Sequence, residues 1–137
     1  MSGKDIGKDM LVSQYMTEQP HTIGYDRPIE NAQKMMREHR IRHLPVLKAG
    51  ELVGVLTDRD INLVLKFETP AATQMNVEEA CTYSPFVTTA DKPLSQVVSE
   101  MRERKIGSTV VVDKDKKVVG IFTDIDAMRA LADLLQA

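Results

Sequence analysis

The stretch Leu-Val-Gly-Val-Leu-Thr-Asp-Arg-Asp at residues 52–60 has a close counterpart, Val-Val-Gly-Ile-Phe-Thr-Asp-Ile-Asp, at residues 118–126. Each copy starts with a short apolar run that favours a buried β-strand. Each ends in Thr-x-x-Asp, a pattern typical of the first turn of a helix. The sequence therefore predicts the same junction, a strand that leads directly into a helix, at two places in the chain.

The similarity between the copies extends upstream of both junctions. Val12 recurs 65 residues later as Val77, and Thr57 recurs 66 residues later as Thr123, because the second copy has one inserted residue. A repeat of this kind indicates two structural units of one type. We expect a flexible amino-terminal tail at residues 1–10, a first repeat at 11–68, a linker at 69–75 and a second repeat at 76–137.

Periodicity predicts the element order β-α-β-β-α in each repeat. Short strands are expected near Thr22 and Val87, and the longer strands are expected at residues 43–47, 52–56, 109–112 and 118–122. The first helix of each repeat begins at a proline, Pro28 or Pro93, where the missing N–H costs no hydrogen bond. The apolar side chains expected to face inward from the helices are Ile29, Ala32, Met35, Met36, Ile61, Val64 and Leu65 in the first repeat, and Leu94, Val97, Val98, Met101, Ile125, Met128, Leu131 and Leu135 in the second.

Neither repeat is large enough to be very stable alone, since a unit of about 60 residues buries only about 60% of its unfolded surface. We therefore expect an α/β fold in which two pseudo-symmetric repeats pack sheet to sheet. Such packing creates two equivalent clefts, and clefts between subdomains are common ligand sites.

Composition narrows the choice of partners. The 137 residues are 42% hydrophobic and 28% charged with a formal net charge of -2, so bulk charge favours neither nucleic acid nor an acidic membrane surface. No apolar run approaches the roughly 20 residues of a membrane span, so direct membrane insertion is not expected. Cys81 is the only cysteine, which excludes an intrachain disulfide and fits a reducing compartment. The expected location is the cytoplasm.

The Thr-x-x-Asp motif supports two interpretations. A helix amino terminus offers free N–H groups and a positive dipole end to a phosphate, and a carboxylate can accept hydrogen bonds from both hydroxyls of a ribose. The same pattern is close to a capping box, in which the threonine and the acid satisfy only their own helix end. The two roles can coexist, because capping uses only some of the available donors.

Over nearly the whole chain, from Val12 to Leu135, the sequence resembles a stand-alone tandem pair of CBS domains, the family named after cystathionine beta-synthase. The resemblance rests on the two stretches quoted above together with Tyr15-Met16-Thr17 and Pro20, the segment His-Arg-Ile-Arg-His-Leu-Pro-Val at residues 39–46, and Lys-Ile-Gly-Ser at residues 105–108.

This resemblance implies a binding site for an adenosyl ligand. The residues it assigns to phosphate and ribose are Thr57, Asp60, Thr123 and Asp126. Those it assigns to the purine pocket and the phosphate path are Thr22, Ile23, Ile41, Arg42 and His43 in the first copy, and Val87, Thr88, Ile106, Gly107 and Ser108 in the second. Arg42, His43 and Arg59 are replaced in the second copy by Gly107, Ser108 and Ile125, so the cationic groups suited to phosphate belong to the first copy.

The expected function is that of a sensor that binds AMP, ADP or ATP and signals to an effector protein. The resemblance further implies a disc-like homodimer. One alternative is a ligand-free scaffold for protein interaction, and another is a binder of a different adenosyl ligand, S-adenosylmethionine or NAD.

Catalysis and metal binding are not expected. The sequence contains neither a glycine-rich phosphate loop nor a nucleophile elbow, and Cys81 has no histidine in its own repeat to act as a base. His21, His39 and His43 have no cysteine partners for zinc. The residues therefore predict no catalytic group, no metal ligand and no catalytic cofactor.

Overall fold

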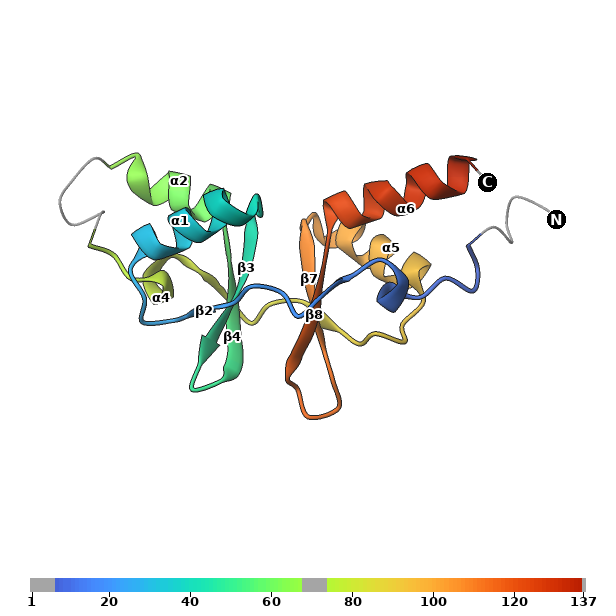
Figure 1. Cartoon of the computed structure of the whole chain (residues 1–137), viewed down its shortest axis with the longest axis horizontal. Coiled ribbons are helices and arrows are strands. Elements are labelled where there is room, and N and C mark those ends of the chain that lie inside the picture. Colours follow the sequence, from blue (N-terminus) through green and yellow to red (C-terminus); the bar gives the residue numbers. More distant parts are fainter. Residues whose placement is uncertain (1–6, 68–73, 137) are drawn as a thin grey trace. The chain divides into compact units, whose positions relative to one another are not determined.

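The computed structural model describes residues 7–67 and 74–136. It contains two compact units (Figure 1). One, called here the central unit, is the continuous segment Pro20–Pro85. The other, called here the terminal unit, combines Met1–Gln19 with Phe86–Ala137 and is thus built from the two ends of the chain.

The central unit is a four-stranded sheet with its helices on one face (Figure 1). Strand β2 pairs in parallel with β3, and β3 with β4 and β4 with β5 are antiparallel. The elements are β2 (Ile23–Gly24), α1 (Ile29–His39), β3 (His43–Lys48), β4 (Glu51–Thr57), α2 (Asp58–Leu65), α4 (Val77–Ala80) and β5 (Thr82–Tyr83).

The terminal unit repeats this arrangement with the sheet order β1-β8-β7-β6. Its parallel pair is β6 with β7, and the other two pairs are antiparallel. The elements are the 3-10 helix η2 (Val12–Gln14), β1 (Thr17–Glu18), β6 (Val87–Thr88), α5 (Leu94–Arg104), β7 (Ser108–Val112), β8 (Val118–Thr123) and α6 (Asp124–Gln136). The predicted order β-α-β-β-α is confirmed in both units.

Each sheet takes its last strand from the other sequence repeat. Strand β5 follows the expected linker but pairs with β4, so that Tyr83 lies opposite Gly54. Strand β1 precedes the first repeat's own helix but pairs with β8, so that Thr17 lies opposite Ile121. Most of the expected tail and linker, residues 1–6 and 68–73, lies outside the described residues.

Both cores form where apolar side chains of the strands meet the helices. In the central unit Leu44, Val46 and Leu56 pack with α1 and α2. In the terminal unit Val111 and Phe122 pack with α5 and α6. The inward-facing residues confirmed as buried are Ile29, Ala32, Met36, Ile61, Val64, Leu94, Val97 and Met101. Met35 and Leu65 are partly buried against the central core.

The predicted inward stripe of the last helix is wrong. Ile125, Met128, Leu131 and Leu135 are 48% to 76% exposed, and Val98 on α5 is also exposed. The buried face of α6 instead contains Asp126 and Ala130. Ala127 and Ala130 of α6 pack with the core of the terminal unit, and the larger apolar residues lie on another side of the helix, where they are exposed. Within the described ranges, no helix is both long and apolar enough to cross a membrane.

Candidate functional site

The first candidate site is the junction between β4 and α2. Thr57 has an extended backbone and caps α2, with its Oγ1 accepting a hydrogen bond from the N–H of Asp60 at 3.1 Å. In return, the N–H of Thr57 donates to Oδ2 of Asp60 at 2.9 Å. The capping box considered from the sequence is therefore present. A cap of this kind leaves other donors of the first turn, and the positive end of the helix dipole, facing outward.

Strand pairing brings several predicted site residues to this junction. His43, the first residue of β3, lies directly opposite Thr57, and the carbonyl of Arg42 accepts the N–H of Asp58 at 3.0 Å. Arg59 follows in the first turn of α2 and is exposed. Two cationic residues, a histidine and a Thr-x-x-Asp motif thus meet at one end of the central sheet, which is a suitable arrangement for an anion.

The junction between β8 and α6 has the same backbone construction with different side chains. Ser108 lies opposite Thr123, and the carbonyl of Gly107 accepts the N–H of Asp124 at 2.9 Å. Oδ2 of Asp126 accepts from the N–H of Thr123 at 2.9 Å and from its Oγ1 at 3.3 Å. The terminal unit therefore has the capping geometry without the cationic side chains of the central unit.

The first strands lie farther along each sheet. Ile23 is paired with Val46, three residues beyond the start of β3, which corresponds to about 10 Å of strand. Its side chain is buried in the central core, while that of Thr22 is partly exposed. The side chain of Ile23 therefore belongs to the core and not to an exposed binding surface.

The equivalent positions in the terminal unit differ in exposure. Val87 is 43% exposed, whereas Thr88 is buried. Ile41 and Ile106 directly precede the junction residues of their units; Ile41 packs against the central core and Ile106 is exposed. Each unit thus brings the residues that flank its Thr-x-x-Asp motif to one end of its sheet, while the residues of its first strand lie farther along that sheet.

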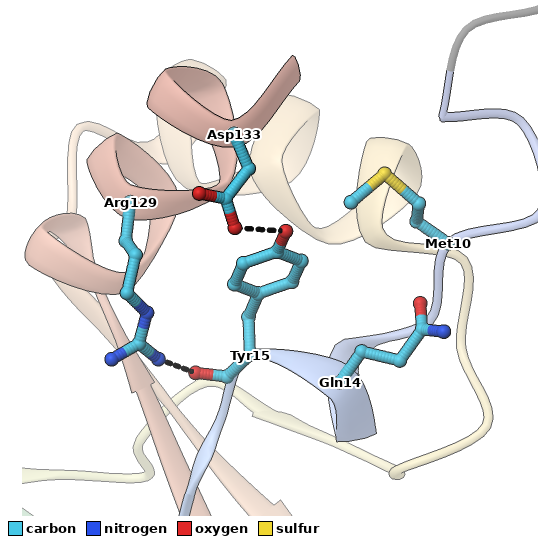
Figure 2. Close-up of a pocket in the computed structure, with 5 residues that line it drawn as sticks. All are labelled: Met10, Gln14, Tyr15, Arg129 and Asp133. Atoms are coloured by element: carbon cyan, nitrogen blue, oxygen red, sulfur yellow. Dashed lines mark hydrogen bonds between the residues drawn. The ribbon is translucent and has the colours of Figure 1, made fainter. Parts of the chain in front are cut away.

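A group of side chains that the sequence analysis missed surrounds Asp126. Arg129, one turn later on α6, donates from Nη2 to Oδ1 of Asp126 at 3.2 Å and to the backbone carbonyl of Tyr15 at 2.7 Å. The hydroxyl of Tyr15 donates to Asp133 at 2.7 Å, and this hydrogen bond raises the pKa of Tyr15 (Figure 2). With Met10 and Gln14, these residues line an open hollow of about 390 Å³. The sequence feature that could have indicated this group is Arg129, three residues after Asp126, because the equivalent position after Asp60 is Leu63.

The remaining chemically active side chains form no site in the described part of the chain. The rings of His21 and His39 stack with centroids 3.7 Å apart, and no group of three or more metal-ligating side chains occurs within residues 7–67 and 74–136. Burial of the Cys81 thiol raises its pKa, which lowers the fraction of reactive thiolate.

Comparison with solved structures identifies proteins with a similar fold. The CBS domain pair of protein MJ0100, solved in complex with 5'-methylthioadenosine and S-adenosyl-L-methionine, is 31% identical and superposes with a TM-score of 0.81, over 89% of this chain and 99% of that one. CBSX2, solved in complex with AMP, is 26% identical with a TM-score of 0.79, over 90% of this chain and 97% of the other.

Comparison with curated proteins finds relatives of greater length. Homoserine O-acetyltransferase of Methanohalobium evestigatum is 30% identical over 123 residues, which are 89% of this chain and 24% of that protein. L-aspartate semialdehyde sulfurtransferase of Methanocaldococcus jannaschii is 32% identical over 120 residues, 87% of this chain and 23% of that protein. The chain spans about a quarter of the length of these two relatives.

The family model of the CBS domain matches two segments, residues 12–66 and residues 77–133. They correspond to the two sequence repeats and together include both Thr-x-x-Asp junctions. The chain therefore belongs to the CBS domain family and carries two CBS domains in tandem.

Proposed function

We propose that this chain is a regulatory module that binds an adenosyl ligand at a Thr-x-x-Asp junction and transmits the bound state to an effector protein. The proposed ligands are AMP, ADP and ATP. The proposal assigns binding and not turnover to the chain, because its motif acids already act as helix caps. A cytoplasmic location is part of the proposal, and the single cysteine is consistent with a reducing compartment.

The observation that carries the proposal is the β4–α2 junction. It combines a helix amino terminus, the hydroxyl of Thr57, the carboxylate of Asp60 and the nearby cations Arg42 and Arg59. The helix end and the cations suit phosphate, and the carboxylate suits the two hydroxyls of a ribose. An adenosine phosphate has both of these groups.

The choice of ligand within the adenosyl class rests on the comparisons. One relative was solved with AMP and another with S-adenosyl-L-methionine and 5'-methylthioadenosine. We favour the nucleotides because Arg42 and Arg59 provide charge for a phosphate, which S-adenosylmethionine lacks. S-adenosylmethionine and NAD are the ligands to test next.

Isothermal titration of nucleotide-free protein with AMP, ADP and ATP tests the proposal. We expect saturable binding that Asp60→Asn weakens about tenfold or more, because asparagine retains an acceptor for the Thr57 N–H but loses the charged acceptor for ribose. Asp58→Asn, which removes the neighbouring carboxylate of the same turn, is the matched control and should bind as the wild type does. Equal affinity in wild type and Asp60→Asn would exclude the assigned role of Asp60.

A second candidate, a ligand-free interaction scaffold, is favoured by the local hydrogen bonds of both motifs: a full capping box at Thr57 and Asp60, and hydrogen bonds from Thr123 to the Asp126 carboxylate. Thermal melting separates the two functions. A ligand present at one hundred times its Kd adds about 2.7 kcal/mol to the free energy of unfolding, whereas a scaffold melts at the same temperature with and without nucleotide.

The proposal also includes pairing of two copies of the chain through α6. Ile125, Met128, Leu131 and Leu135 form an exposed apolar face on this helix. Such a face is typical of a surface covered by another protein. Because one face on one helix can pair with itself about a twofold axis, a second copy of the chain provides a complementary partner.

A further inference from the structure

The aspartates of the two Thr-x-x-Asp motifs differ in how many of their carboxylate oxygens already accept a hydrogen bond within the protein. The side chain of Asp126 is only 8% exposed, and both of its oxygens accept hydrogen bonds, Oδ2 from Thr123 and Oδ1 from Arg129. Asp60 is half-buried, and its Oδ2 accepts from the N–H of Thr57. Within residues 7–67 and 74–136, the structure shows no hydrogen bond to Oδ1 of Asp60.

The difference originates in three positions of the repeat. Arg129 donates to the Asp126 carboxylate. It also donates to the Tyr15 backbone carbonyl, and the Tyr15 hydroxyl donates to Asp133 (Figure 2). The equivalent positions in the central unit are occupied by Leu63, Ala80 and Phe67. None of these three side chains can donate a hydrogen bond to a carboxylate.

We propose that Arg129 makes the two motifs unequal, so that Asp60 receives the ribose of an adenosyl ligand while Asp126 is retained as a structural partner of Arg129. This inference rests on the proposed function and names which motif performs it. Arg129 is a positioning residue that acts through Asp126.

The physical reason is competition for the same carboxylate oxygens. A ribose diol bound to Asp126 would have to replace the guanidinium at Oδ1, and hydrogen bonds between two charged groups are stronger than those from a neutral hydroxyl. The same guanidinium also donates to the Tyr15 carbonyl, so its displacement would remove one of the hydrogen bonds that join α6 to the segment before β1, another being from Tyr15 to Asp133. Asp60 accepts a diol without either loss.

The test is isothermal titration with AMP, ATP and S-adenosylmethionine, each as a separate probe, of the full chain and four variants. We expect one molecule bound per chain, at least tenfold weaker binding in Asp60→Asn, and less than threefold change in Asp126→Asn. Arg129→Leu, which copies Leu63 of the other repeat, should bind a second molecule. Leu63→Arg, which places a guanidinium one turn from Asp60, should weaken the first site.

The outcomes separate the inference from the proposed function. If none of the three probes binds wild type or any variant, the proposed function fails and the inference fails with it. If wild type binds two molecules, or if Asp60→Asn and Asp126→Asn weaken binding equally, the proposed function stands and the inference is overturned. A stoichiometry of one in a folded Arg129→Leu protein, with folding checked by circular dichroism, also overturns it, because a merely structural arginine would not control the number of sites.

Discussion

Gly54 and Gly120 lie at equivalent places, where the edge strand of each sheet comes closest to its neighbour. A Cβ on Gly54 would lie 2.6 Å from the backbone carbonyl oxygen of Thr82, and one on Gly120 would lie 2.7 Å from Sδ of Met16. The first obstacle is backbone that is fixed by pairing, whereas the second belongs to a flexible side chain, and the backbone oxygen of Thr17 lies farther from that Cβ, at 3.1 Å. The backbone is therefore more crowded at Gly54 than at Gly120.

We accordingly expect Gly54→Ala to lower the free energy of unfolding by roughly 1–3 kcal/mol, the range typical of overpacking. Gly120→Ala is the matched comparison and should cost less, because the Met16 side chain can move away. Urea denaturation followed by circular dichroism measures both. A larger loss in Gly120→Ala would contradict the assignment of backbone crowding to Gly54.

At the scale of single elements, helices α1 and α5 are both followed by a residue with a strained backbone conformation. Each is followed by a residue in the left-handed conformation, Arg40 with φ 54° and Lys105 with φ 56°. A left-handed backbone conformation is common at the position after a helix. Glycine usually occupies that position, because a Cβ atom strains the left-handed conformation. Both residues are exposed, so their side chains contribute little packing in return.

Substitution of glycine at this position should therefore stabilise the protein. We expect Lys105→Gly to raise the free energy of unfolding by up to about 1 kcal/mol through relief of left-handed strain. The control is Arg102→Gly, three residues earlier inside α5, which should lower it by about 1 kcal/mol. The two midpoints in urea should move in opposite directions, and a loss of stability in Lys105→Gly would show that its side chain has a structural role.

Individual elements were also what the sequence predicted best. Prolines, apolar periodicity and the Thr-x-x-Asp motif depend on local chemistry, so the helices and the longer strands lie where they were expected. The inward face of α6 differs from the prediction because the most apolar residues of this helix are not the ones that face the core. Shifting the buried Ile61 and Val64 by the repeat offset selects Ala127 and Ala130, and both lie on the packed side of α6.

Local sequence patterns could not predict the group of side chains around Asp126. Tyr15 and Arg129 are 114 residues apart, and they meet because the segment before β1 and helix α6 belong to the same compact unit. Both motifs were predicted correctly as strand-to-helix junctions. Their inequality depends on long-range contacts of this kind, and periodicity carries no information about such contacts.

For the whole molecule, the exposed face of α6 determines the expected assembly. Met128 is 63% exposed at the middle of this face, and a charge there would be buried without a partner if two copies pair through α6. We expect Met128→Glu to convert a dimer to a monomer in sedimentation velocity at micromolar concentration. Lys114→Gln, which makes the same change in net charge in an exposed turn, should leave the sedimentation coefficient of the dimer unchanged. An unaltered dimer in Met128→Glu would place the interface elsewhere.

The exchange of edge strands also decides which part of the chain can fold as a unit. A fragment of residues 11–68 follows the sequence repeat, yet it lacks β5 and Val77, whose side chain is fully buried in the central core. A fragment of residues 20–85 contains that core and all four strands of its sheet.

We therefore expect fragment 20–85 to be the more stable of the two, although both are near the lower size limit for a stable domain. Loss of a buried valine leaves a cavity, and loss of β5 leaves β4 as an unpaired edge, so fragment 11–68 should show little cooperative melting. Thermal melts monitored at 222 nm compare them directly. If fragment 11–68 melts at the higher temperature, then the sequence repeat, and not the compact unit, is the element that folds, and the exchanged segments contribute little to the stability of the sheets they join.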